Sequence, residues 1–175
     1  MTAQQDELSK YIRNIPDWPK KGILFRDITP LLANPSAFKT AVKRLCDKFI
    51  DKEIDYIAAV EARGFIFGSA VAAELNAGFI PIRKKGKLPA QTESVTYDLE
   101  YGQDTLQIHK DSFEKGSKIL LVDDLLATGG TMAASCRLIE KLGGEVAGIA
   151  FLIELSALHG REKLKGYNLH VVITY

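Results

Sequence analysis

The chain has 175 residues, of which 46% are hydrophobic and 26% charged, and its formal net charge is +1. These values are ordinary for a globular protein, exclude wholesale disorder and favour one domain over residues 1–175 with a substantial core. A charge this close to neutral gives no argument for a nucleic acid or a membrane as partner.

The first third of the chain predicts two helices. Apolar residues at helical spacing (Leu8, Tyr11, Ile12 and Ile15) predict an amphipathic helix that ends at Pro16, because the residue before a proline avoids helical geometry. After a loop and the short apolar piece ILFRDITP, Asn34 is a predicted N-cap with Pro35 at the first helical position.

The middle of the chain alternates between strands and helices. Residues 55–60 and 79–83 predict buried strands, and residues 65–76 predict a helix rich in small residues. The segment 84–110 differs, because a basic loop is followed by period-two alternation around a glycine, which indicates a hairpin.

The last third returns to the alternating pattern. A strand over 118–124 precedes a helix over 131–143, for which Gly143 is the expected C-cap, and strands over 145–154 and 168–175 follow. The whole pattern predicts an α/β fold with a mostly parallel central sheet flanked by helices. Ligands of such sheets bind outside the carboxyl ends of the strands, where the hairpin could act as a flap.

The cysteines and the apolar runs indicate the cellular compartment of the protein. Cys46 and Cys136 fall on apolar stripes without metal-ligand spacing, which indicates buried free thiols of a reducing compartment. The polar N-terminus has no signal-peptide core, and the run 146–153 is far shorter than the about 20 residues that span a bilayer. The sequence therefore predicts a soluble cytoplasmic protein.

The stretch LLVDDLLATGGT at residues 120–131 is the strongest functional signal. Its glycines allow close backbone approach, its threonines add hydroxyl donors, and the following helix directs about half a positive charge toward the turn. Asp123 and Asp124, expected at the strand end, could accept hydrogen bonds from hydroxyls or coordinate Mg²⁺. A phosphate cradle beside paired acids indicates a phosphorylated sugar, whereas neither a Walker loop nor a dinucleotide fingerprint is present.

This stretch resembles the 5-phosphoribosyl pyrophosphate (PRPP) signature of type I phosphoribosyltransferases. Further blocks resemble the adenine-specific members of that family, in the expected order across nearly the whole chain: FRDITPLL (25–32), EARGFIFG (61–68), IRKKGKLP (82–89), YDLEYG (97–102) and GREKL (160–164). The resemblance implies the type I phosphoribosyltransferase fold, with a flexible hairpin flap at about 84–110, a PRPP loop at 123–131 and a small hood. It also implies purine salvage, in which the phosphoribosyl group of PRPP moves to N9 of adenine and gives AMP and pyrophosphate.

The resemblance also implies roles for individual residues. The 5′-phosphate would be bound by Ala127, Thr128, Gly129, Gly130 and Thr131. The ribose hydroxyls would be bound by Asp123 and Asp124. Pyrophosphate would be bound by Arg63, Lys84 and Lys87. Mg²⁺ would bridge oxygens of the substrate and would not occupy a metal site of the protein. Phe25, Arg26 and Leu125 match adenine-binding positions, Glu100 matches a flap acid/base, and Tyr101 would seal the flap. A cis peptide is expected at Glu61–Ala62, and the family forms homodimers, for which the N-terminal helix and residues 65–76 are candidate interface elements.

Two other functions remain open at this stage. One is a phosphoribosyltransferase for xanthine, guanine, hypoxanthine or orotate, against which FRDITPLL and YDLEYG argue. The other is a non-catalytic PRPP-sensing regulator, which should carry a basic extension or lack the flap acid, and this chain shows neither.

Overall fold

The computed structural model describes residues 7–98 and 102–175 and places a seven-stranded sheet at their centre, with the order β5-β6-β4-β3-β7-β8-β9. Strands β4, β3, β7, β8 and β9 are parallel to one another. At the edge of the sheet, β6 pairs antiparallel with β4, and β5 pairs antiparallel with β6. The bounds are β3 Tyr56–Val60, β4 Gly78–Lys84, β5 Thr92–Asp98, β6 Gln103–His109, β7 Lys118–Leu126, β8 Glu145–Glu154 and β9 Leu169–Thr174. The predicted mostly parallel sheet is confirmed.

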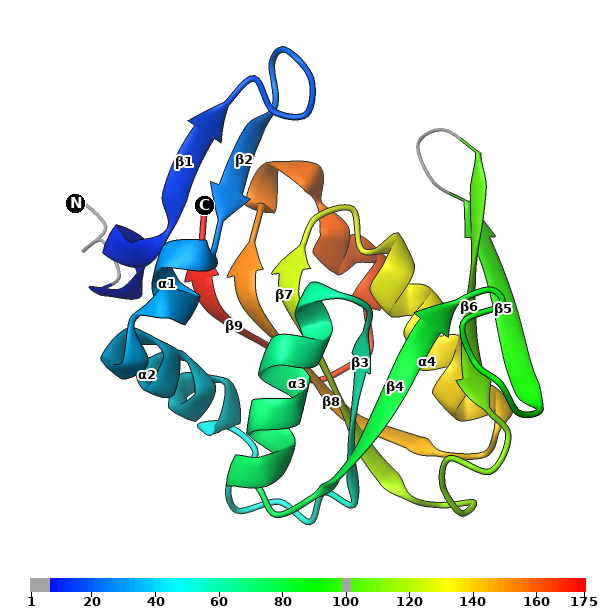
Figure 1. The fold of residues 1–175 in the computed structure, drawn as a ribbon. Coiled ribbons are helices and arrows are strands. Elements are labelled where there is room, and N and C mark those ends of the chain that lie inside the picture. The colour runs from blue at the N-terminus through cyan, green and yellow to red at the C-terminus, as the bar shows by residue number, and fades with distance from the viewer. Residues whose placement is uncertain (1–6, 99–101) are drawn as a thin grey trace.

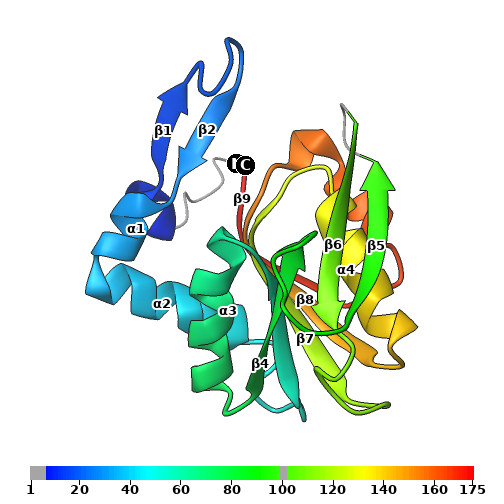
Figure 2. The same cartoon turned by 45° about the vertical axis from the view of Figure 1, so that its right-hand side comes forward.

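Helices cover both faces of this sheet. Helices α2 (Pro35–Cys46) and α3 (Arg63–Glu74) lie on one side, and α4 (Gly130–Lys141) lies on the other (Figure 2). The predicted cap of α2 is confirmed, because the Asn34 side chain accepts a hydrogen bond from the backbone N–H of Ala37.

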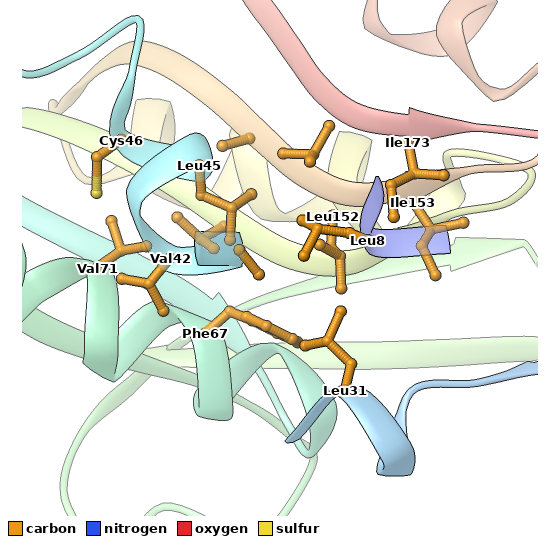
Figure 3. Packing of buried hydrophobic residues seen from close by; sticks show 14 of the residues in the cluster. Leu8, Leu31, Val42, Leu45, Cys46, Phe67, Val71, Leu152, Ile153 and Ile173 are labelled. Atoms are coloured by element: carbon orange, nitrogen blue, oxygen red, sulfur yellow. The ribbon is translucent and has the colours of Figure 1, made fainter. Parts of the chain in front are cut away.

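The core consists of one apolar cluster on each face of the sheet. In the first cluster, Phe67 of α3 packs with Val42 and Leu45 of α2 (Figure 3). The second cluster packs the buried face of α4, including Cys136, against β7 and β8. Burial on both faces explains why the parallel strands read as continuous apolar runs.

The N-terminal segment differs from its prediction. A short 3₁₀ helix, η1 (Glu7–Tyr11), is followed by strand β1 (Arg13–Pro16), so the predicted helix up to Pro16 is wrong beyond η1. Strand β1 pairs antiparallel with β2 (Leu24–Asp27), and this pairing takes precedence over the helical spacing of the apolar residues. Leu8 and Ile12 are nevertheless buried, so these two apolar residues contact the core although the segment is not one long helix. The hairpin β1–β2 projects from the body as the predicted hood (Figure 1).

The second hairpin, formed by β5 and β6, confirms the alternation seen in the sequence. Its inner strand extends the central sheet through Arg83↔Gln107 and Lys84↔Leu106, so the hairpin adds to the sheet edge. Its tip, residues 99–101, lies outside the described residues, and its flexibility stays a prediction.

Two further sequence expectations concern the environment of the chain. Cys46 and Cys136 are both free and buried, as predicted. None of the helices in the described part of the chain has the length and apolar character needed to cross a membrane. The extent of the domain, residues 1–175, stays a prediction.

Asp27 ties the hood to the body. Its buried carboxylate accepts hydrogen bonds from the Arg13 guanidinium at 2.6 and 3.0 Å. It also accepts hydrogen bonds from the backbone N–H and the hydroxyl of Thr29, at 2.9 and 2.6 Å, at the start of α1 (Thr29–Ala33). The Thr29 hydrogen bonds, with Arg13 beside them, lower the pKa of Asp27 to about 2.

Replacing Asp27 with Asn should therefore lower the melting temperature at neutral pH. The ionised form is favoured in the folded state, so its contribution is complete above the unfolded pKa of about 3.9 and disappears as pH falls through about 2. The deficit of Asp27→Asn should shrink over the same window in thermal unfolding followed by circular dichroism. Asp51→Asn, at an exposed position, is the matched control, and a deficit independent of pH would contradict this account.

Candidate functional site

The glycine-rich stretch forms a loop between β7 and α4. Gly129 has a φ of +76°, in the left-handed region that glycine adopts without strain, and Gly130 begins the helix. The backbone from Ala127 to Thr131, together with residues of β7, lines a small cavity of about 90 Å³. The free N–H groups at the start of α4 lie at this loop, as an anion site requires.

The paired acids lie within β7 and not at its end as predicted. Pairing with β8 continues through Asp123↔Phe151 to Leu126↔Glu154, which carries the strand past both carboxylates. The apolar residues that follow the acids, Leu125 and Leu126, continue the ladder because Leu126 is buried against the core.

Asp123 and Asp124 are held in different ways. The Asp123 carboxylate accepts a hydrogen bond of 2.9 Å from the backbone N–H of Asp124. It also lies where a Cβ on Gly64 would approach within 2.7 Å, so α3 needs glycine there. Asp124 is buried, and one of its carboxylate oxygens lies 2.9 Å from Nε of Arg63.

The two carboxyls perturb each other. Burial, followed by the neighbouring charge of Asp124, raises the pKa of Asp123 well above its usual range. Burial also raises the pKa of Asp124, although the guanidinium of Arg63 opposes that shift. Ionising both carboxyls in the folded protein therefore costs free energy, which a bound cation or hydrogen-bond donor would reduce.

The EARG turn closes this part of the site. The peptide bond between Glu61 and Ala62 is cis, as predicted. The Glu61 carboxylate accepts a hydrogen bond of 2.9 Å from the backbone N–H of Lys84 and lies 3.3 Å from Nε of Arg83. The turn is thus fixed to the end of β4, and Arg63 and Lys84 face the same space.

That space is a cavity of about 350 Å³ next to the loop. Its lining comes from the EARG turn, β4, the hairpin β5–β6 and β7: Val60, Glu61, Ala62, Arg63, Lys84, Tyr97, Asp104, Leu106, Asp123, Asp124, Leu125 and Thr131. Asp123, Leu125 and Thr131 line both this cavity and the smaller loop cavity. Asp123 therefore stands between an N–H-lined loop and a chamber that contains a guanidinium and an ammonium, and Asp124 lies in the chamber beside it.

Two polar residues of the hairpin β5–β6 that line this chamber were not predicted as site residues from the sequence. Tyr97 and Asp104 lie opposite each other in the β5–β6 ladder. The Tyr97 hydroxyl lies 3.2 Å from the hydroxyl of Thr131, and an Asp104 oxygen lies 3.2 Å from Nζ of Lys84. Burial raises the pKa of Tyr97, which stays a neutral hydroxyl. The period-two alternation of the hairpin was the available signal, because it puts both residues on one face.

The other predicted residues are less closely gathered. Phe25 lies on β2 with its ring 5.3 Å from the Arg63 guanidinium, so it reaches the chamber through that side chain. The Arg26 side chain points elsewhere, with its guanidinium 3.7 Å from the ring centre of Tyr175. Among the described residues, neither of these two, nor exposed Lys87, lines the chamber. Glu100 and Tyr101 lie outside the described residues.

Comparison with known proteins gives the same family along most of the chain. A family model described as phosphoribosyl transferase domain matches residues 29–172. The adenine phosphoribosyltransferase of Pseudothermotoga lettingae is 58% identical over 169 residues, which cover 97% of this chain and 99% of the relative. That of Halothermothrix orenii is 57% identical over 167 residues, 95% of this chain and 98% of the relative.

Solved structures agree with these relatives. The adenine phosphoribosyltransferase of Thermoanaerobacter pseudethanolicus superposes with a TM-score of 0.94 at 52% identity, covering 97% of this chain and 98% of the other. The Saccharomyces cerevisiae enzyme, solved with an imino-altritol bisphosphate and adenine, has a TM-score of 0.91 at 38% identity, covering 95% and 97%.

Asp123→Asn should raise the melting temperature at neutral pH. Because the folded-state pKa of Asp123 is raised, its ionisation costs folding free energy above the unfolded pKa of about 3.9. Removing a cost of about 1 kcal/mol shifts the melting temperature of a domain of this size by about 2–4 °C. The gain should vanish as pH falls toward 4, and calorimetry across pH checks this.

The matched control for that experiment is Asp111→Asn, at an exposed position away from the site. It should leave the melting temperature within error at every pH. A loss of stability in Asp123→Asn at neutral pH would show that hydrogen bonding to the ionised carboxylate outweighs its burial.

Proposed function

Because the chain belongs to the phosphoribosyltransferase family, we infer that it acts in purine salvage as an adenine phosphoribosyltransferase. It transfers the 5-phosphoribosyl group of PRPP to N9 of adenine and releases AMP and pyrophosphate. The fold is that of the type I family, as the superpositions require. The observation that carries the function is the position of Asp123, which lines both the loop cavity and the chamber that holds Arg63 and Lys84, with Asp124 beside it in the chamber, since PRPP is a ribose with phosphate at both ends.

The PRPP loop takes the 5′-phosphate in this proposal. The N–H groups of Ala127–Thr131 and the hydroxyls of Thr128 and Thr131 are the donors, and the α4 N-terminus contributes a positive partial charge. Asp123 and Asp124 accept hydrogen bonds from the ribose 2′ and 3′ hydroxyls. These donors also relieve the electrostatic cost of the buried acid pair.

The chamber takes the pyrophosphate. Arg63 and Lys84 line it, and Lys87 follows Lys84 in the turn after β4, where its backbone N–H donates to the Lys84 carbonyl. In the free protein, Arg63 and Lys84 are paired with Asp124 and Asp104. Bound substrate exchanges these carboxylates for phosphate oxygens, so both cations are already in place.

Bond cleavage leaves positive charge on the ribose at C1′. The fixed carboxylates of Asp123 and Asp124 stabilise that charge more in the transition state than in the ground state. Arg63 and Lys84 stabilise the negative charge that develops on the leaving pyrophosphate. The protein therefore divides the two developing charges between β7 and the turn at its side.

Mg²⁺ is the proposed cofactor, and the site fits it. Asp124 Oδ2 is buried and forms an ion pair with Nε of Arg63 at 2.9 Å, but it accepts no hydrogen bond of good geometry from the described residues, so it can take a further cationic contact. Within residues 7–98 and 102–175, no group of three or more His, Cys, Asp or Glu side chains could hold a metal, which favours binding through substrate oxygens beside Asp123 and Asp124. The bound ion would neutralise part of the pyrophosphate charge.

Adenine is placed beside the ribose, between Phe25 and Leu125. Leu125 lines the chamber, and the Phe25 ring lies against Arg63 on the hood side. Backbone groups at Arg26 would read the edge of the base, which agrees with the Arg26 side chain pointing toward Tyr175. The base thus lies between the hood and the sheet.

The flap supplies the remaining groups. Glu100 is the proposed acid/base near N7 of the purine, and Tyr101 closes the flap over the site. Closure excludes water, which would otherwise hydrolyse PRPP once positive charge develops at C1′.

A homodimer in the cytoplasm is the proposed working form. Ile66 on α3 and Phe79 on the adjacent β4 are exposed large apolar side chains, which supports the predicted interface at residues 65–76. The buried free thiols support a reducing compartment. Sedimentation equilibrium would test the dimer, because a monomeric mass at working concentration would exclude it.

A base panel tests the function directly. Purified protein, PRPP and Mg²⁺ are incubated with adenine, hypoxanthine, guanine, xanthine or orotate, and nucleotide formation is followed by chromatography. AMP from adenine alone is expected. Turnover of another base would overturn the assignment of Phe25, Arg26 and Leu125, and PRPP binding without turnover would indicate a regulator.

Glu100→Gln separates chemistry from binding in the same assay. Loss of proton transfer should lower kcat by about 10²- to 10⁴-fold, while binding of pyrophosphate to the free protein stays unchanged. Glu114→Gln, at an exposed position on the body, is the control and should keep full activity. An unchanged kcat in Glu100→Gln would remove Glu100 from the mechanism.

A further inference from the structure

The segment that follows β8 returns to the PRPP loop. It contains two short 3₁₀ helices, η2 (Ser156–Leu158) and η3 (Gly160–Leu164), and η3 is the GREKL block. In Figure 1 this part of the chain lies next to the loop that joins β7 to α4. None of the roles proposed above uses it.

Two glycines allow η3 and the loop to touch through their backbones. A Cβ on Gly160 would lie 2.2 Å from the carbonyl oxygen of Ala127 and 3.1 Å from the nitrogen of Gly129. Conversely, a Cβ on Gly129 would lie 2.4 Å from the carbonyl oxygen of Gly160. Neither position can hold a side chain unless the loop or η3 moves.

An ion pair between buried Glu154 and exposed Arg161 fixes η3 in this position. Glu154 ends β8 and is buried, and its two carboxylate oxygens accept hydrogen bonds from Nε and Nη2 of Arg161 at 2.6 and 2.7 Å. Two parallel bonds of this length define the direction of the guanidinium as well as its distance. Gly160 is the residue before Arg161, so the pair sets where the Gly160 backbone lies.

Glu154 is itself fixed to the strand that carries the loop. It pairs with Leu126, the last residue of β7, and the N–H of Leu155 donates to the Leu126 carbonyl at 2.9 Å. At the other end of η3, the side chain of Leu164 is buried in the core cluster of α4. The segment is therefore anchored on both sides of its contact with the loop.

We propose that Gly160 and the Glu154–Arg161 ion pair are positioning residues that hold the PRPP loop in the shape that binds the 5′-phosphate. The inference rests on the proposed function of that loop. The backbone of η3 contacts the loop at Ala127 and Gly129, so the donors of the loop are aligned before the phosphate arrives. Such preorganisation matters because small displacements of binding groups weaken binding and slow catalysis by large factors.

Ribose 5-phosphate and pyrophosphate are the probes that test this proposal, because each reports one end of the PRPP site. Their dissociation constants are measured by titration calorimetry for the full chain and for Gly160→Ala, Arg161→Met and Arg161→Lys. Gly160→Ala and Arg161→Met should weaken ribose 5-phosphate by about tenfold or more and leave pyrophosphate within about twofold. Arg161→Lys should fall between the parent and Arg161→Met, since lysine keeps the charge but not the paired geometry.

Kinetics provide the second readout. The KM for PRPP should rise in Gly160→Ala and Arg161→Met, while the KM for adenine stays unchanged. Lys165→Met, at an exposed position directly after η3, is the matched control and should keep the parent values. If Gly160→Ala does not fold, the two Arg161 variants decide the question.

Two results would overturn the proposal. One is unchanged binding of both probes in the variants, and the other is an equal loss of both, which reports general damage to the fold. If the parent chain makes AMP and its variants show either of these two results, only this inference is refuted. A parent chain that binds neither ribose 5-phosphate nor PRPP refutes the proposed function and the inference with it.

Discussion

A carboxylate that leaves water loses several kcal/mol of hydration free energy, and β7 places two of them side by side at Asp123 and Asp124. The surrounding elements supply partial compensation. Arg63 lies against Asp124, the N–H of Asp124 turns toward Asp123, and the start of α3 brings its positive partial charge close because Gly64 has no side chain. The EARG turn, α3 and β7 therefore depend on one another, and the compensation is left incomplete where a sugar would bind.

The same edge of the sheet collects what a substrate with two charged ends requires. The loop before α4 is rich in donors and carries no cationic side chain of its own, which suits a terminal phosphate fixed in direction. The chamber instead holds Arg63 and Lys84, which suit a leaving group whose negative charge grows during the reaction. Under the proposed function, each half of the site has the chemistry of the group assigned to it, and β7 runs between them.

Much of this arrangement was readable from the sequence, for identifiable reasons. Strands buried on both faces are continuous apolar runs, and Asn34 before Pro35 marks a helix start through local chemistry. The chain between Ile12 and Pro16 was misread because its conformation is set by pairing with β2, which is distant in sequence. Tyr97 and Asp104 were missed for a similar reason, since the alternation gives the face of each residue within its own strand, and only the hairpin register places the two opposite each other at the chamber. The family resemblance named Phe25 and Arg26 together, but as neighbours in strand β2 their side chains point to opposite sides.

The short ladder between β4 and β6 has a mechanical consequence. The hairpin joins the central sheet through only two paired positions among the described residues, Arg83↔Gln107 and Lys84↔Leu106. Lys84 is also held by Glu61 through its backbone and by Asp104 through its ammonium. A movement of the hairpin relative to β3 would therefore also displace the residue that carries this ammonium. Under the proposed function, movement of the hairpin over the substrate and placement of the Lys84 ammonium at the pyrophosphate are therefore coupled.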